Sequence, residues 1–588
     1  MFSQKTIKSL FLKCKDTKSV AKIHALLITS GYIHGNNCST QLIASYFKTG
    51  YIENGHKVFD KTPKRGIDVW NAIIIAYSRK NCPEKVLSLY KELNLESVKP
   101  DSSTFTVALK ACSSTMELEM GEEIRDDVRD HGYENDVFVA SSLLNLYVKC
   151  GRMDEAMNVF GNMKRRDVVS WTTMVSGFAQ CGRGVEAIEV YRLMQKEGVE
   201  GDRVAVLGLV QACANVGSMK IGLSVHGYLI RRHVRLMDVV VQTSLVDMHT
   251  KNGNLEYAEW VFKSMQHKNV VSWSTLISGY AQNGFASNAL NLLVEMQKLR
   301  FKPDEASIIG VLLACSQLGC LKLAKSLHAY VLKMLSFNEV VGTSFIDVYS
   351  KCGSLPYARK LFNTIPSKDL VLWNTMIASY GIHGHGNEAI KMFHNMLEAN
   401  TKPDHTTFAS LLSALSHAGL VDKGRLWFNL MVNEYNIEPT SKHYACMADL
   451  LARGGHVEEA YNLTGSMKTE PGLPFWAALL SGCHNHGKFL IGEMVTKKII
   501  DLNPNENSGI YGLISNFYAK MGKWNEVADV RNVMKKSGIK KVPGNSVVEV
   551  HGKLHPFVME DKCHFQYQEI LKILEMLDLE MTSIEDQM

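Results

Sequence analysis

The stretch that decides the fold is VVSWSTLISGYAQNG, residues 270–284, which has near-copies around Trp70, Trp171 and Trp373. The copies read WNAIIIAYSR, WTTMVSGFAQ, WSTLISGYAQ and WNTMIASYGI, and their tryptophans lie 101, 102 and 100 residues apart. A fixed period is the signature of a repeat protein, in which each unit buries its apolar face against its neighbours. The sequence therefore predicts stacked copies of one unit.

The apolar residues of each copy have helical spacing. Trp273, Leu276, Ile277 and Tyr280 fall at i, i+3, i+4 and i+7, which makes one apolar stripe on a helix. A glycine turn and a second stripe follow, and a KPD sequence ends the unit, as at 302–304, where proline stops the helix and aspartate can cap the next one. The period divides into three helical pairs of about 35, 34–36 and 31 residues. We expect the four tryptophans to be packing residues.

Composition narrows the class of protein. The chain has 588 residues, of which 46% are hydrophobic and 21% charged, and no apolar run approaches the length of about 18 residues that suggests a membrane span. The net charge of +6 permits a polyanionic partner without requiring one. Cys112, Cys213 and Cys315 recur with the repeat, which predicts small buried side chains. No C-x-x-C pair occurs, which argues against a disulfide framework or zinc ribbon and fits a reducing compartment.

Helical pairs of this length occur in tetratricopeptide and pentatricopeptide repeats. The first kind keeps a fixed period of about 34 residues, whereas this chain cycles three lengths. The phrases DVVSWTTMVSGFAQCG, VVSWSTLISGYAQNG and DLVLWNTMIASYG closely resemble plant pentatricopeptide repeat (PPR) proteins of the PLS subclass, in which P, L and S motifs alternate. The resemblance implies an all-α fold, a right-handed α-solenoid superhelix of about 16 helix-turn-helix repeats.

The resemblance also assigns the parts of the chain. Residues 1–35 are expected to hold a short leader, with Lys5, Lys8, Lys13 and Lys15, and a partial L repeat. Residues 36–472 form the PLS array of about 13 repeats, 473–541 two E motifs, and 542–588 an E+ segment with an acidic helical tail. The P motifs are 67–101, 168–202, 270–304 and 370–404; the L motifs 102–136, 203–238 and 305–338; the S motifs 36–66, 137–167, 239–269 and 339–369; and variant L and S motifs 405–440 and 441–472.

Helical-repeat proteins read single-stranded RNA with two or three side chains per base. The resemblance implies that the fifth and last residues of P and S motifs face the base and that the second residues of adjacent motifs sandwich it. The implied base-binding pairs are Asn71 with Asp101, Ser141 with Asp167, Thr172 with Asp202, Thr243 with Asn269, Ser274 with Asp304, Thr343 with Asp369, and Asn374 with Asp404. The implied sandwiching residues are Phe138, Val169, Val240, Val271, Val340 and Val371, all apolar as stacking requires.

The resemblance implies uracil for the asparagine pairs, adenine for Thr243 with Asn269, and guanine for the other serine and threonine pairs. Relatives of this kind direct the editing of a cytidine to uridine in RNA, and the resemblance places the last S motif four nucleotides upstream of that cytidine. Counted from the cytidine, the implied target reads U at −6, G at −7, G at −9, A at −10, G at −12, G at −13 and U at −15. Plain helix capping is the alternative role of the aspartates. Variation among Asn, Thr and Ser at the fifth position, beside fixed neighbours, favours base reading.

Some positions depart from the family pattern. Thr40 has only Gly66 as its partner position, Asp68 occupies a sandwiching position, and Ala445 with Gly472 cannot read a base. A row of lysines at one position of successive S motifs predicts either a phosphate-binding stripe or solvated helix ends; these are Lys48, Lys149, Lys251 and Lys351.

The sequence predicts a non-catalytic protein without cofactor or metal. A C-to-U deaminase needs a zinc-bound water, a glutamate and a C-x-x-C pair, but the one H-x-E sequence, His456-Val457-Glu458, has no such pair downstream. The cluster Cys483-His484-Asn485-His486 is too crowded to suit tetrahedral zinc.

The resemblance implies a site-recognition factor for C-to-U editing that binds single-stranded organellar RNA. A DYW-type deaminase would be recruited in trans through the E and E+ region, with multiple organellar RNA editing factor proteins as further partners. The alternatives are a PPR factor for RNA stabilisation, splicing or translation, and a protein-binding scaffold. The E motifs favour editing, and the variable polar pairs argue against a scaffold. The short leader and E+ ending favour the mitochondrion over the chloroplast, and no membrane contact is expected. The tail after Met559 either caps the solenoid or recruits a partner.

Overall fold

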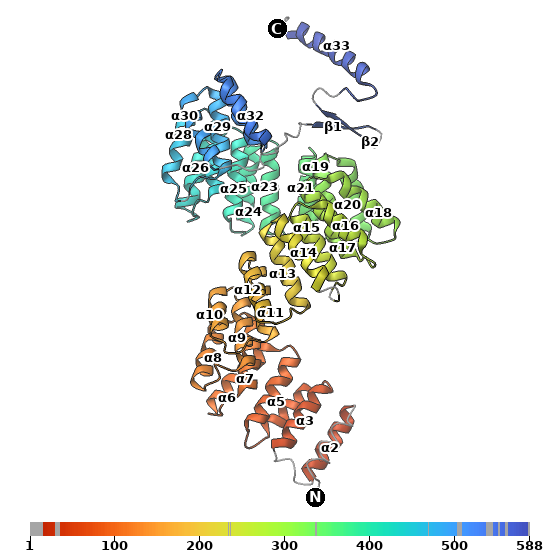
Figure 1. Ribbon diagram of the computed structural model, residues 1–588, viewed down its shortest axis with the longest axis vertical. Helices are drawn as coiled ribbons and strands as arrows, with labels where there is room; N and C mark the ends of the chain where they lie inside the picture. Colours follow the sequence, from red (N-terminus) through yellow and green to blue (C-terminus); the bar gives the residue numbers. More distant parts are fainter. Residues whose placement is uncertain are drawn as a thin grey trace. The chain divides into compact units, whose positions relative to one another are not determined.

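The computed structural model describes residues 16–29, 36–232, 235, 237–334, 338–468, 470–502, 508–536, 545–550, 553–558 and 562–585. These residues form helix–turn–helix pairs that follow one another along the chain (Figure 1). The chain separates into two compact units, one up to Ser272 and the other from Trp273. The four leader lysines lie outside the described residues.

The described part of the first unit is helical. After α2 the helices come in pairs whose first members begin at the motif starts given above. Their bounds are α2 (Thr17–Thr29), α3 (Asn36–Lys48), α4 (Ile52–Asp60), α5 (Ile67–Arg79), α6 (Pro83–Leu95), α7 (Ser102–Thr115), α8 (Leu118–Asp130), α9 (Val137–Lys149), α10 (Met153–Asn162), α11 (Val168–Gln180), α12 (Gly184–Lys196), α13 (Arg203–Val216), α14 (Met219–Arg232), α15 (Val239–Lys251) and α16 (Leu255–Ser264).

The second unit continues the same pattern, beginning within α17. Its bounds are α17 (Val270–Gln282), α18 (Ala286–Lys298), α19 (Glu305–Leu318), α20 (Leu321–Met334), α21 (Glu339–Lys351), α22 (Leu355–Thr364), α23 (Leu370–Ile382), α24 (Gly386–Glu398), α25 (His405–His417), α26 (Val421–Asn433), α27 (Ser441–Arg453), α28 (Val457–Asn462), the 3₁₀ helix η3 (Leu463–Ser466), α29 (Leu473–His486), α30 (Phe489–Asp501), α31 (Ser508–Lys520) and α32 (Trp524–Lys536).

Within each unit the first helix of a pair packs against the first helices of the neighbouring pairs, as α7 does against α9 and α23 against α25. The second helix of a pair contacts its own partner and the first helix of the next pair, as α12 contacts α11 and α13. Within each unit the first helices therefore share one face of the stack. The all-α solenoid predicted from the repeat is confirmed.

The repeat tryptophans form the core, as predicted. Trp70, Trp171, Trp273 and Trp373 are at most 5% exposed. Three of them meet a phenylalanine of the preceding S motif edge to face, with ring centroids 4.7 to 5.0 Å apart: Phe59 with Trp70, Phe160 with Trp171, and Phe362 with Trp373. Edge-to-face pairs stabilise beyond the burial of their area. Each of these three tryptophans thus joins its P motif to the pair before it.

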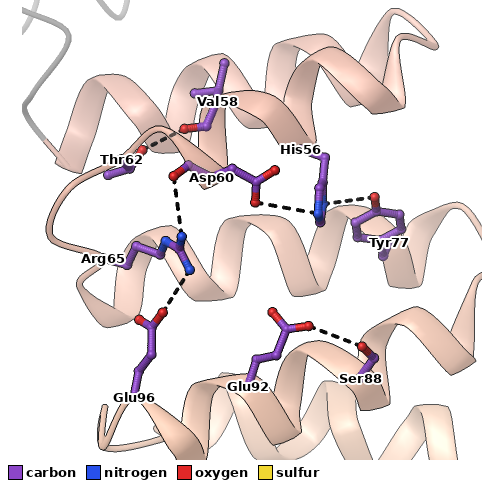
Figure 2. A network of polar contacts seen from close by, with 9 residues as sticks. All are labelled: His56, Val58, Asp60, Thr62, Arg65, Tyr77, Ser88, Glu92 and Glu96. Carbon is purple, nitrogen blue, oxygen red and sulfur yellow. Dashed lines mark hydrogen bonds and ion pairs between the residues drawn. The ribbon is translucent and has the colours of Figure 1, made fainter.

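A basic residue reinforces the same junction. The Arg65 guanidinium donates hydrogen bonds to the Asp60 carbonyl at 3.4 Å and to the Glu96 carboxylate at 2.9 Å (Figure 2). It also lies 4.5 Å from the centroid of the Phe59 ring. The figure shows a second link of the same junction, between His56 Nδ1 and the Tyr77 hydroxyl, 3.1 Å apart.

The following copies repeat this contact. Arg166 donates to the carbonyls of Phe160 at 3.1 Å and Gly161 at 3.2 Å, and to the Glu197 carboxylate at 3.0 Å. Lysines hold the position in the third and fourth copies, where Lys268 and Lys368 each donate to one carbonyl and lie over a phenylalanine ring. We call this residue the junction cation. It lies two residues before the first residue of each P motif and five residues before the repeat tryptophan.

A second periodic contact joins each L motif to the S motif after it. Its pairs are His24 with Tyr46, Arg125 with Tyr147, His226 with His249, and His328 with Tyr349, all at 2.9 to 3.0 Å. The third copy therefore replaces a tyrosine by His249. Burial, and after it the nearby His226, lowers the pKa of His249 to about 4. The imidazole is neutral at physiological pH.

The periodic cysteines are buried, as predicted. Cys112, Cys213 and Cys315 have no exposed surface, and burial raises the pKa of each thiol to about 12. Such thiols are unreactive small core side chains.

The C-terminal segment departs from the helical repeat. β1 (Asn545–Val550) and β2 (Lys553–Val558) form an antiparallel hairpin whose register pairs Asn545 with Val558 and Val550 with Lys553. The hairpin was not expected in an all-α chain, although the sequence VVEVHGKLHPF alternates apolar and other residues around a glycine, which is a strand signal. The acidic tail is helical, as predicted, in α33 (Tyr567–Glu585). Its Ile573, Leu574 and Met576 are exposed.

Candidate nucleic-acid interface

The second residue is apolar and exposed in six of the P and S first helices. The exposed fractions are 71% for Phe138, 59% for Val169, 46% for Val240, 56% for Val271, 58% for Val340 and 59% for Val371. Within each unit these exposed apolar side chains recur at one position of the P and S first helices, and exposed apolar surface of this kind indicates contact with another molecule. These six residues are the ones expected to sandwich bases. Their exposure leaves them accessible for stacking, and the stacking role stays a prediction.

The fold brings three of the predicted P-motif pairs into direct contact. Asn71 Nδ2 donates to both carboxylate oxygens of Asp101, at 3.0 and 2.8 Å. Thr172 Oγ1 donates to Asp202 at 3.2 Å, and Asn374 Nδ2 donates to Asp404 at 3.3 Å. The partners of each pair lie 30 residues apart in sequence, on the first helix of one pair and at the start of the next. Ser274 is buried on α17, and Asp304 lies at the start of α19.

The same aspartates cap helices, as the capping alternative predicted, and their base-reading role stays a prediction. Asp101, Asp202, Asp304 and Asp404 each accept the backbone N–H three residues later, at 2.8 to 2.9 Å. Burial opposes ionisation of Asp404, but hydrogen bonds from Thr407 and Asn374 outweigh it and hold the carboxyl pKa below its usual value. Capping uses one carboxylate oxygen, so it does not prevent a second role of the side chain.

The S-motif pairs are arranged differently. The hydroxyls of Thr243 and Thr343 donate to carbonyls of their own helices, Val239 at 2.6 Å and Glu339 at 2.8 Å. Ser141 Oγ is buried without a hydrogen-bond partner among the described residues. Their partners cap the next helix through the N–H three residues on; these are Asp167, Asn269 and Asp369. Among the described residues, no hydrogen bond joins the two side chains of any of these three pairs.

The four lysines of the predicted phosphate stripe are exposed but not equivalent. Lys251 pairs with Asp247 and Lys351 with Asp347, each at 2.7 Å within one helix. Lys48 and Lys149 form no ion pair among the described residues. An aspartate four residues before a lysine on a helix predicts such an ion pair from sequence alone, and the sequence analysis did not use this pattern.

Lys48 also belongs to a more basic groove than the sequence indicated. A groove of about 630 Å³ between α3 and α5 is lined by Lys48, Arg79 and Lys80 together with Thr40 and Gln41. No acidic side chain lines it. Arg79 and Lys80 were not predicted as part of the interface, because only the S-motif position shows a periodic lysine.

In the described residues, neither the H-x-E sequence nor the cluster at Cys483 forms a catalytic site. Glu458 of the H-x-E sequence pairs with Lys488 at 2.8 Å, and Val457 is buried within α28. Cys483 is buried, and His486 Nε2 lies 3.2 Å from the Arg453 carbonyl. In the described ranges no three His, Cys, Asp or Glu side chains gather in a way that could hold a metal ion. No helix in those ranges has the length and apolarity needed to cross a membrane.

Family models match much of the repeat array. The PPR repeat family model matches residues 67–114, 166–215 and 368–417. The PPR repeat model matches 38–67, 138–168, 243–270, 271–301, 343–370 and 406–435, and the E motif model matches 486–549.

The chain is similar along its whole length to plant relatives. A putative mitochondrial pentatricopeptide repeat-containing protein of Arabidopsis thaliana is 50% identical over 581 residues, covering 99% of this chain and 96% of the relative. The chloroplastic pentatricopeptide repeat-containing protein DOT4 of Arabidopsis thaliana is 35% identical, with 96% of this chain and 65% of the relative covered. The crystal structure of maize PPR10 matches with a TM-score of 0.53 at 17% identity, over 92% of this chain and 89% of that one. The chain belongs to the pentatricopeptide repeat family, in its PLS subclass with an E motif.

Proposed function

We propose that this protein binds single-stranded organellar RNA in a sequence-specific way and acts as a site-recognition factor for C-to-U editing, with the deaminase supplied in trans. The observation that carries the proposal is a groove of about 280 Å³ that Val371, Asn374 and Asp404 line together. It places an exposed apolar side chain beside a hydrogen-bonding pair. A nucleobase needs both, because its face stacks and its edge carries donors and acceptors.

The chemistry of this pair favours uracil. Asp404 accepts hydrogen bonds, so the Asn374 amide nitrogen faces it and donates at 3.3 Å. The Asn374 Oδ1 atom is buried and has no hydrogen-bond partner among the described residues. A buried acceptor without a donor costs about 1–3 kcal/mol, which a bound donor would recover. Uracil and guanine carry a ring N–H on the Watson–Crick edge, whereas cytosine and adenine present an unprotonated nitrogen there. The ring N–H of uracil or guanine can therefore satisfy this oxygen, and of these two bases uracil is the one that the family resemblance implies.

The editing role rests on the C-terminal region and on the relatives. The E motif match at residues 486–549 lies beyond the array, where PLS proteins of the editing class carry such motifs. The names of the relatives point to organelles, mitochondrial for the one at 50% identity and chloroplastic for DOT4. We propose the mitochondrion, with the chloroplast as the alternative. RNA stabilisation, splicing or translation would use the same groove.

Binding assays with altered protein and altered RNA test the reading. Asn374→Ser should turn the preference at position −6 from U to G, because serine with Asp404 matches the other implied guanine pairs. One base contact is worth about 1–3 kcal/mol, so the preference should change by about tenfold or more. Changes at −9, −10, −12 and −13 should weaken binding of the unaltered protein more than changes at −8, −11 and −14. Equal loss at all positions would contradict base reading and revive the scaffold alternative.

The editing role has a separate test. Transcriptome sequencing of a plant line that lacks the protein should show loss of one or a few organellar C-to-U sites. Intact editing with changed splicing or abundance of a transcript would favour the alternative role of the same RNA-binding surface.

A further inference from the structure

Three cysteines meet where the L motif at 305–338 contacts the S motif at 339–369. Cys320 lies in the turn between α19 and α20, and Cys352 lies in the turn between α21 and α22. The Cys315 carbonyl accepts from both residues, from the Cys320 backbone N–H at 3.0 Å and from the Cys352 thiol at 3.7 Å. Because α19 packs against α21, this shared acceptor places the two turns side by side.

The two turn positions also touch at the preceding junction of an L motif with an S motif. There they hold Ser218 and Asn252, and the Asn252 side-chain nitrogen donates to the Ser218 carbonyl at 3.5 Å. One junction earlier they hold Glu117 and Cys150. Among these three junctions, the one at α19 and α21 is therefore the one with a cysteine at both positions. Its pair of thiols is not a general feature of the repeat.

The two thiols differ in access. Cys352 is half-buried, which leaves its sulfur open to a small molecule, whereas Cys320 is 5% exposed. Burial, and after it the nearby Cys320 and Asp347, raises the pKa of the Cys352 thiol to about 11. A thiol reacts through its thiolate, so Cys352 reacts slowly at neutral pH and the pair rests in the reduced form. Disulfides that do form inside cells are usually transient and redox-sensing.

We propose that Cys320 and Cys352 form a reversible disulfide that joins the two motifs when the surroundings become oxidising. The oxidant is a small disulfide such as glutathione disulfide. The Cys352 thiolate attacks one of its sulfurs and releases a glutathione thiolate, and the Cys320 thiolate then attacks the Cys352 sulfur and releases the second. The two cysteine protons pass to the two glutathione thiolates, so one disulfide is reduced as the other forms.

The disulfide would close the chain between residues 320 and 352, which contains all of α21. A cross-link of this kind removes conformational freedom from the opened state of the loop. Amide hydrogen exchange in α21 should therefore slow on the order of 100-fold on oxidation. The same helix carries Val340 and Thr343 of the predicted RNA-binding face, so oxidation would hold this part of the face against the pair before it.

The first test is peptide mapping of the full-length protein after incubation with glutathione disulfide at mildly alkaline pH. Free thiols are blocked with iodoacetamide before tryptic digestion and mass spectrometry. Trypsin leaves Cys352 in one peptide and Cys315 with Cys320 in another, and these two peptides should be linked until dithiothreitol is added. Cys112 and Cys150 are the internal control, because they match Cys315 and Cys352 at a junction without the third cysteine. They should not be linked.

Substitutions identify the partner of Cys352. Cys315→Ser should keep the link, whereas Cys320→Ser should abolish it and leave Cys352 as a mixed disulfide with glutathione. Fragmentation of the linked peptides from the unaltered protein gives the same assignment without any effect of substitution on folding.

Three outcomes would overturn the inference. The first is a mixed disulfide on Cys352 of the unaltered protein with no link to Cys320. The second is a link that survives Cys320→Ser or that forms equally between Cys112 and Cys150. The third is equal hydrogen exchange of α21 in the oxidised and reduced proteins, because the disulfide would then not hold the two motifs together.

Discussion

The junction cation gives the sharpest stability prediction, and Arg166 is its best case. Its side chain is 24% exposed and makes two hydrogen bonds to carbonyls, one ion pair and a contact 4.9 Å from the Phe160 ring centroid. Hydrogen bonds from a charged donor are worth about 1.5 kcal/mol each. The half-exposed ion pair and the ring contact contribute about 0.5 kcal/mol each. Ordering the side chain costs about 2 kcal/mol. Arg166→Ala should therefore cost about 2 kcal/mol.

Amide hydrogen exchange followed by mass spectrometry is the appropriate assay, because stability in a repeat protein is local. A loss of about 2 kcal/mol corresponds to about 30-fold faster exchange in peptides from α10 and α11. Arg166→Lys should recover part of the protection, since lysines make one carbonyl bond at this position in Lys268 and Lys368.

The matched control is Arg165→Ala. Arg165 is the adjacent residue, of the same type and charge, and it is exposed. It should change exchange by less than about threefold, as is usual for surface substitutions. Equal effects of Arg165→Ala and Arg166→Ala would refute the reasoning, because charge alone rather than the contacts would then account for the change.

Three further predictions follow from burial. Gly482→Ala should lower the midpoint of thermal unfolding, because the new Cβ would lie 2.5 Å from Ala452 Cβ and 3.0 Å from backbone atoms that cannot rotate away. The free energy of unfolding should fall by about 2 kcal/mol. An unchanged midpoint would show that α27 and α29 can separate freely. The pKa of His249, lowered by burial to about 4, lies below the usual 6.5, so the unfolded chain binds the extra proton and stability falls as pH drops from 6.5 toward 4. His249 should contribute about 2 kcal/mol to the loss of stability between pH 7 and pH 5, and His249→Tyr, which restores the residue of the other copies, should remove that contribution in chemical denaturation series at the two pH values. Iodoacetamide should label the exposed Cys181 well before the buried Cys213, whose thiol pKa is raised to about 12; mass spectrometry of timed samples would detect any inversion of that order.

The repeat made the fold predictable from sequence. One apolar stripe, such as Trp171, Met174, Val175 and Phe178, recurs in phase, and all four side chains are buried. The KPD sequences predicted where helices begin, because a proline stops one helix and an aspartate caps the next. Such signals depend only on neighbouring residues, so a single sequence contains them.

Contacts between distant residues could not be predicted in the same way. Nothing local shows that Thr172 meets Asp202 while Thr243 turns to its own helix. The choice depends on how two packed helices lie against each other, and residues far apart in the sequence give no local signal of that. The junction cation was also missed, because its main acceptors are backbone carbonyls, which every residue has.

The shared use of the capping residue has a consequence for how such proteins diversify. Asn269 caps α17 through an Oδ1 contact of 2.9 Å to the Ser272 N–H, just as Asp167 caps α11 at 2.8 Å. Asparagine and aspartate are nearly equal as N-caps, so exchanging one for the other leaves the helix intact. The exchange nevertheless replaces an acceptor by a side chain that can also donate. Under the proposed base reading, a single exchange of asparagine and aspartate at this position would change the preferred base while the stability of the fold stayed nearly the same.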